Sequence, residues 1–177
     1  MELKGKNVLI FAGPAYEDRE LFYPLYRFQE AGATVKVAGI GEKRYEGKYG
    51  VPVDVDGQAE DFKGTKWDIV VVPGGWAPDK IRMNEAALAI VRDTLKAGNI
   101  VAAICHGPWV LASAGVVNGR TVTSYKAIKD DLTHAGAKWV DREVVEDGGI
   151  ITSRTPADLP AFCGEIIRVA QGSKVTA

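Results

Sequence analysis

The sequence predicts an α/β domain in which a mostly parallel, doubly wound sheet carries helices on both faces. Two features predict this fold. Short apolar segments alternate with segments of helical periodicity, and the apolar segments lack the polar alternation of strands that expose one face. Strands that are apolar on both faces need helices on both sides. The 177 residues suit one compact domain, which we expect to span residues 1–177.

The expected strands are apolar runs that stop at glycine, proline or a polar residue, and they cover residues 7–12, 34–38, 68–72, 100–104 and 121–124. The expected helices place apolar residues three and four positions apart. They cover residues 18–31, 85–97, a segment that ends near 114, 127–135 and 156–170. Glycine-punctuated residues 44–56 predict a small antiparallel hairpin. Residues 139–140, 143–145 and 150–153 predict short late strands, which could form an antiparallel edge.

Together these elements predict a flavodoxin-like arrangement. Sheets of this kind place their sites at the carboxyl ends of the strands. That rule directs attention to the loops at residues 13–18, 73–79 and 105–109.

Composition excludes several classes of function. The 22 basic and 23 acidic residues give a net charge of −1 without a basic stripe, which argues against binding to nucleic acid. The two cysteines form no disulfide framework and fit a reducing compartment. No leader pattern or membrane-spanning run is evident, so we expect a cytoplasmic protein without membrane binding. Two histidines and two distant cysteines indicate no metal site.

Cys105 is the sharpest chemical feature of the sequence. It directly follows the apolar run 100–104 and precedes His106-Gly107-Pro108, so it occupies a strand-to-helix turn. The amino end of a helix favours a thiolate and lowers the pKa of a cysteine. A cysteine that only packs in the core is the alternative, and that interpretation fits Cys163 better. We therefore expect Cys105 to be a reactive thiol exposed at the sheet edge.

Three further features lie near the same expected edge. His106 is placed to reach the cleft, although adjacent residues at a turn seldom bond each other well. Gly74 and Gly75 follow the third strand, where their N–H groups could hold an oxyanion, or could simply form a turn. Glu17 follows the first strand and is expected to face Cys105. The other acidic residues beside it, Asp18 and Glu20, are explained by the start of a helix.

The motifs Val72-Pro73-Gly74-Gly75, Ala103-Ile104-Cys105-His106-Gly107-Pro108 and Ile151 to Leu159 resemble those of the PfpI branch of the ThiJ/PfpI superfamily. This superfamily has the class I glutamine amidotransferase-like fold. The likeness covers nearly the whole chain. It implies a cysteine-dependent enzyme that needs no cofactor, with Cys105 as nucleophile and His106 as its histidine.

The resemblance also assigns roles to other residues. The glutamate that contacts the thiol falls on Glu17, and the oxyanion donors are N–H groups near Gly75 and His106. The acid that orients the histidine comes from a neighbouring subunit in the family, and it falls on Asp79, where many relatives have glutamate. This implies a homo-oligomer, either a dimer or a hexamer, with the site near an interface. Trp76 replaces a polar residue and is expected to shape the pocket.

Four functions follow from the resemblance and the residues. The favoured one is a glyoxalase or deglycase that acts on small carbonyl compounds or glycated substrates. The alternatives are an intracellular cysteine peptidase and a redox-sensing or stress-protective protein whose thiol oxidises readily. A glutaminase is disfavoured, because the histidine after His106 is His134, which is followed by Ala135-Gly136 rather than by the late His-x-Glu of that chemistry.

Overall fold

A computed structural model describes residues 1–172 of the chain. Within this range the central sheet has seven strands in the order β10-β11-β7-β6-β1-β2-β5. All its pairs are parallel except β10 with β11. The strands are β1 (Asn7–Phe11), β2 (Thr34–Gly39), β5 (Gly57–Gln58), β6 (Ile69–Val72), β7 (Ile100–Ile104), β10 (Val144–Asp147) and β11 (Ile150–Ser153). The predicted doubly wound α/β fold is therefore confirmed.

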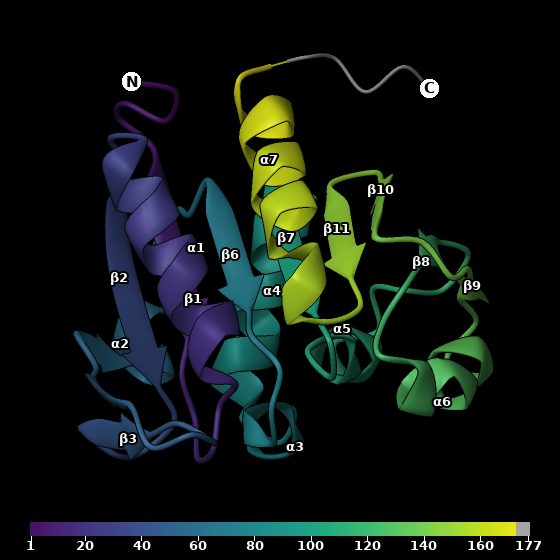
Figure 1. Ribbon diagram of the computed structural model, residues 1–177, viewed down its shortest axis with the longest axis horizontal. Helices are drawn as coiled ribbons and strands as arrows, with labels where there is room; N and C mark the ends of the chain where they lie inside the picture. Colours follow the sequence, from purple (N-terminus) through teal and green to yellow (C-terminus); the bar gives the residue numbers. More distant parts are fainter. Residues whose placement is uncertain (173–177) are drawn as a thin grey trace.

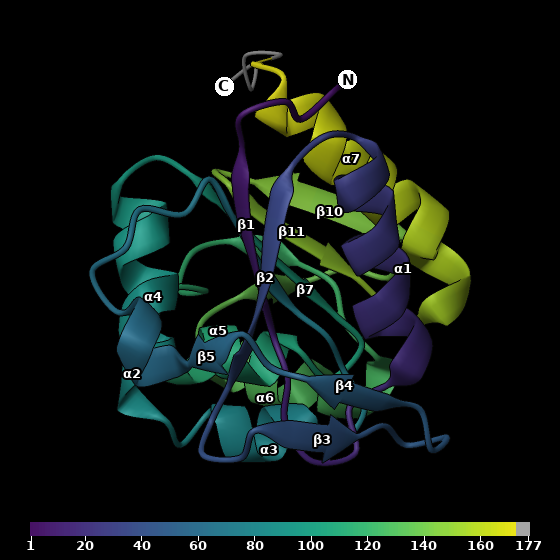
Figure 2. The same ribbon diagram turned by 90° about the vertical axis from the view of Figure 1, so that its left-hand side faces the viewer.

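Helices cover both faces of the sheet, as Figure 1 and Figure 2 show. One face carries α1 (Asp18–Glu30) and α7 (Leu159–Ala170), which lie side by side (Figure 1). The other face carries α4 (Glu85–Lys96), with α2 (Ala59–Phe62) beside it, and α5 (Pro108–Ser113) (Figure 2). Because both faces are covered, β6 and β7 are buried at every position, which explains their unbroken apolar sequences.

Smaller elements lie around the sheet. The antiparallel hairpin of β3 (Arg44–Glu46) and β4 (Pro52–Asp54) lies at the carboxyl ends of the parallel strands, near α3 (Ala77–Ile81) (Figure 2). A separate parallel pair joins β8 (Thr121–Val122) to β9 (Lys138–Trp139), beside η1 (Lys126–Ile128) and α6 (Lys129–His134). The short turn η2 (Pro156–Asp158) precedes α7. No helix among the described residues is long and apolar enough to cross a membrane.

Most expected elements match the structure, and the differences are confined to short segments. The run at 121–124 is not a strand of the central sheet, since β8 pairs only with β9. The loop expected at 73–79 contains the first residues of α3, so Asp79 lies on a helix. The expected late antiparallel edge is present as β10 and β11, and β11 also continues the parallel sheet beside β7.

Candidate functional site

Cys105 occupies a strained turn between β7 and α5. Its φ is +62°, a left-handed conformation that costs a residue with a side chain about 1–2 kcal/mol. Two backbone hydrogen bonds hold it there: its N–H donates to the Ser153 carbonyl at 3.0 Å, and its carbonyl accepts from the Tyr125 N–H at 2.9 Å. Gly107 allows the turn, because a Cβ at this position would lie 2.4 Å from the Val72 carbonyl oxygen. The fold therefore stores strain at the sulfur-bearing residue.

The carboxylate beside the thiol belongs to Glu20. Its Oε2 accepts the Gly74 N–H at 2.7 Å, and the carboxyl group interacts with the Cys105 thiol. Its other oxygen, Oε1, is buried and has no hydrogen-bond partner among the described residues. Burial, and after it the nearby Glu17 charge, raises the pKa of Glu20 to about 8. Glu20 is therefore mostly protonated at neutral pH and can donate to the sulfur.

Glu17 lies in the same pocket but has another role. Its side chain caps α1 by accepting the Glu20 N–H at 2.9 Å, and it pairs with Arg19 at 2.6 Å. The expectation that Glu17 contacts the thiol is therefore wrong. The physical reason is rotation around the helix: a residue before the first turn points back to the free N–H groups, whereas Glu20 points toward the sheet.

The electrostatic environment of Cys105 also differs from the expectation. The side chain is buried, with only 9% exposed, rather than open at the sheet edge. Burial raises the pKa of the Cys105 thiol to about 12, and the negative charge of ionised Glu20 raises it too. The N–H groups of Gly75 and His106 act on the sulfur in the opposite direction. With this raised pKa, the thiol is mostly protonated at neutral pH.

The N–H groups beside the sulfur are those of Gly75 and His106, the two positions at which oxyanion donors are expected. The Gly74 N–H is not available, because Glu20 accepts it, so that part of the expectation is wrong. Gly74 instead provides room, since a Cβ there would lie 2.7 Å from the Cys105 Cβ. Gly75 is held in place by the hydrogen bonds that Glu17 and Trp76 make across the loop to Gly74 and Ala15.

His106 lies directly against the nucleophile. Its Nδ1 is 3.3 Å from the Cys105 sulfur, so these adjacent residues do meet, contrary to the expectation. Burial lowers the pKa of His106, and the positive charge of Lys48 lowers it further. The imidazole stacks on the Tyr125 ring, with 5.0 Å between the ring centres, and its centre lies 5.1 Å from that of Trp109 and 5.7 Å from that of Trp76. A neutral imidazole held by aromatic rings can accept or relay a proton at the sulfur.

The predicted Trp76 and Asp79 lie in different places. Trp76 is 57% exposed and lines the pocket that contains Cys105. The Asp79 side chain is 56% exposed, pairs with Lys80 at 3.3 Å and lies outside the residues that line this pocket. Within one chain, the carboxylate that the structure places at the thiol is Glu20 and not Asp79.

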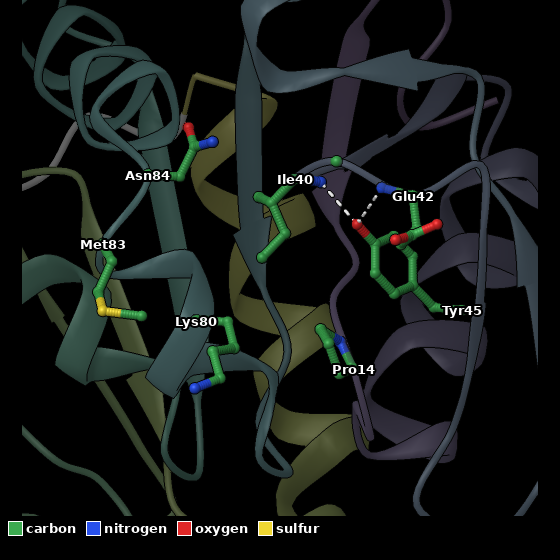
Figure 3. A pocket seen from close by; sticks show the side chains of 8 residues that line it. Pro14, Ile40, Glu42, Tyr45, Lys80, Met83 and Asn84 are labelled. Atoms are coloured by element: carbon green, nitrogen blue, oxygen red, sulfur yellow. Dashed lines mark hydrogen bonds between the residues drawn. The ribbon is translucent and has the colours of Figure 1, made fainter.

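The pocket itself has a volume of about 350 Å³ and opens at the carboxyl edge of the sheet. Its lining joins the sulfur and its neighbours to a rim of exposed side chains, namely Arg19, Lys48, Tyr49, Trp76 and Tyr125. A second hollow of about 380 Å³ lies between the loop after β2 and α3 (Figure 3). It is lined by Lys80, Met83 and Glu42 among others, and the lining includes no cysteine, serine or threonine. The reactive chemistry is therefore concentrated in the Cys105 pocket.

Sequence reasoning did not identify Glu20, Asp18 or Lys48. The burial of Glu20 could have been found, because it lies on the stripe of α1 that also buries Pro24 and Phe28. Lys48 comes to the pocket from the tip of the β3–β4 hairpin, and local sequence does not indicate where such a tip lies. No three histidine, cysteine, aspartate or glutamate side chains in residues 1–172 form a set that could hold a metal ion.

Comparisons with known proteins agree with this architecture. The model of the DJ-1/PfpI family matches residues 6–169. A protein of Pyrococcus abyssi that is named a deglycase is 45% identical over 92% of this chain and 98% of its own length. A putative cysteine protease of Bacillus subtilis is 34% identical over 93% of this chain and 98% of its own. The crystal structure of Drosophila melanogaster DJ-1beta has a TM-score of 0.89 at 30% identity, covering 96% of this chain and 92% of that one. The chain belongs to the DJ-1/PfpI family.

Proposed function

We propose that this protein is a cysteine-dependent enzyme that acts on reactive carbonyl compounds and their adducts, in the manner of a deglycase or glyoxalase. The observation that carries the proposal is the arrangement around the Cys105 sulfur: the N–H groups of Gly75 and His106, the Glu20 carboxyl group and the His106 ring all meet there. The deglycase name of the Pyrococcus abyssi relative supports the same class of substrate.

The proposed reaction begins when the Cys105 sulfur displaces the amine or thiol from the former aldehyde carbon of a 2-oxoaldehyde adduct, so that a C–S bond replaces the C–N or C–S bond of the adduct. The thiol proton passes to Glu20 in its ionised form, which is a minor fraction near neutral pH because the pKa of this carboxyl group is about 8. The carbonyl oxygen becomes an oxyanion, which the N–H groups of Gly75 and His106 stabilise. His106 then delivers a proton to the departing amine or thiol. The proton on the sulfur-bearing carbon then moves to the neighbouring ketone carbon through an enediolate, which oxidises the first carbon to a thioester and reduces the second to a carbinol. Water hydrolyses the thioester, so that one adduct and one water give the free amine or thiol and one 2-hydroxy acid.

A peptidase uses the same nucleophile and remains the second candidate, favoured by the name of the Bacillus subtilis relative. Redox sensing is a third candidate, in which peroxide oxidises the Cys105 sulfur to a sulfenic acid. We also propose that the protein acts in the cytoplasm as a homo-oligomer. In that assembly, exposed Asp79 would orient the His106 ring of another subunit, and exposed Trp76 would contribute to the substrate pocket.

Turnover of methylglyoxal and of a glycated peptide tests the main proposal. We expect Cys105→Ala to abolish both activities and Cys163→Ala to retain them, because Cys163 is buried in α7 away from the pocket. Equal rates for wild type and Cys105→Ala would refute the proposal. Cleavage of an unmodified peptide that depends on Cys105, without carbonyl turnover, would favour the peptidase.

A further inference from the structure

A buried carboxylate outside the reaction described above holds the β3–β4 hairpin at the pocket. Asp18, in the first turn of α1, is only 6% exposed. Its two oxygens accept the N–H groups of Tyr49 and Val51 at the hairpin tip, each at 2.9 Å. Gly47 is needed for this approach, because a Cβ there would lie 2.3 Å from the Asp18 Oδ1.

Two further hydrogen bonds fix the same tip. The Tyr16 hydroxyl donates to the Val51 carbonyl, and the Lys48 N–H donates to the Tyr16 carbonyl at 2.8 Å. An exposed hairpin tip needs none of these buried partners to satisfy its backbone, since water can do so. The bonds therefore fix the position of the tip relative to the thiol pocket.

The anchored hairpin tip places the Lys48 side chain at the pocket. It lines the hollow that contains Cys105 and His106, and it is close enough to His106 for its charge to act on the imidazole. Among the ion pairs of residues 1–172, none includes Lys48, whereas the neighbouring Arg19 is paired with Glu17. The ammonium group lies beside the Tyr49 ring, 5.6 Å from its centre.

We propose that Lys48 selects substrates that carry an anionic group, so that the preferred ligands are carbonyl compounds with a carboxylate near the reacting carbon. This inference extends the proposed function by naming the substrate class, and it rests on the same pocket. Asp18 acts as a positioning residue because it holds the tip on which Lys48 lies. The ammonium group attracts the anion while the carbonyl reaches the Cys105 sulfur.

Alkylation of Cys105 by iodoacetate and iodoacetamide tests the inference without depending on turnover. The two reagents undergo the same displacement at sulfur and differ in that iodoacetate carries a negative charge. We expect Lys48→Met to lower the ratio of the iodoacetate rate to the iodoacetamide rate about threefold to fivefold, as for a partly exposed ion pair. Lys48→Arg should retain the ratio. Lys43→Met is the matched control, because Lys43 is an exposed lysine that directly precedes β3 and lies outside the pocket lining.

A catalytic comparison and a positioning variant complete the test. For 4,5-dioxopentanoate against its neutral amide, Lys48→Met should reduce the preference for the anion, measured as the ratio of the two kcat/KM values. Asp18→Asn should reduce the same preference although Lys48 is intact. An unchanged ratio in Lys48→Met, an equal fall in Lys43→Met, or no reaction of Cys105 with either reagent would overturn the inference. The wild-type protein could instead show no carbonyl turnover while Lys48→Met still lowers the ratio of the two alkylation rates. That result would overturn the proposed function and leave the inference about Lys48 intact.

Discussion

Replacing Glu20 with glutamine should make the protein more stable at neutral pH and remove part of its pH dependence. Burial raises the pKa of Glu20 from 4.5 to about 8, so the folded protein binds this proton more tightly than the unfolded chain does. Stability therefore falls as pH rises from about 4.5 and levels off above about 8. The shift corresponds to about 3 kcal/mol by pH 7 and about 5 kcal/mol once the group is fully ionised. The Glu20 side chain is fully buried, so solvent screens this effect little.

Glutamine suits this test because its amide oxygen can still accept the Gly74 N–H while the side chain stays neutral at every pH. Urea unfolding followed by circular dichroism, at fixed ionic strength and in small pH steps, gives the free energy of unfolding of both proteins. The difference between them should be near zero below pH 4.5 and should grow in favour of the variant up to about pH 8. The raised pKa of Cys105 lies above this window and does not contribute.

Glu30→Gln is the matched control, because Glu30 is an exposed glutamate at the other end of α1. The difference in free energy of unfolding between Glu30→Gln and wild type should stay nearly constant across the same pH range. The free-energy difference between Glu20→Gln and wild type could instead be constant with pH, or the variant could be less stable at neutral pH. Either result would show that Glu20 ionises in the folded protein without loss of stability. The described proton exchange with Cys105 would then be wrong.

Three other outcomes follow from the structure. The rate of Cys105 alkylation by iodoacetamide should reach half its maximum at a pH above ~8.5, the pKa of a free cysteine. Glu20→Gln should lower the pH of this midpoint, because it removes a negative charge beside the thiol. A wild-type midpoint below pH ~8.5 would contradict the effect of burial. Gly107→Ala should lower the melting temperature sharply and cost more than about 3 kcal/mol, because its Cβ would meet two backbone carbonyls; an unchanged melting curve would refute this. Asp18→Ala should destabilise the fold by about 2–4 kcal/mol in urea unfolding, since two N–H groups lose their acceptor; a loss below about 1 kcal/mol would count against the hairpin anchor.

The sequence predicted the central strands well because their burial leaves a direct trace. β1, β6 and β7 are apolar at nearly every position, and each ends at a turn residue or at Cys105. Short elements leave no such trace. β5 has two residues and α2 has four, too few for a period to be recognised, and their existence depends on contacts with distant parts of the chain.

The site was predicted in part for the same reason. Cys105 and His106 follow a buried strand directly, so their place at the carboxyl edge could be inferred from chain order. The choice between Glu17 and Glu20 depends on which side of α1 faces the sheet, and both residues fit a helix start. The contribution of Lys48 depends on the tertiary anchoring of a hairpin tip by Asp18, which neighbouring residues do not encode.

The first turn of α1 is capped by its own preceding residue and contacts two other segments of the chain. Glu17 holds the helix start, Asp18 holds the hairpin tip, and Glu20 holds the loop that bears Gly74 beside the sulfur. The hairpin tip and the Gly74 loop both border the Cys105 pocket, and both are bonded to this one helical turn. A substitution that displaces the turn should therefore alter two sides of the pocket together.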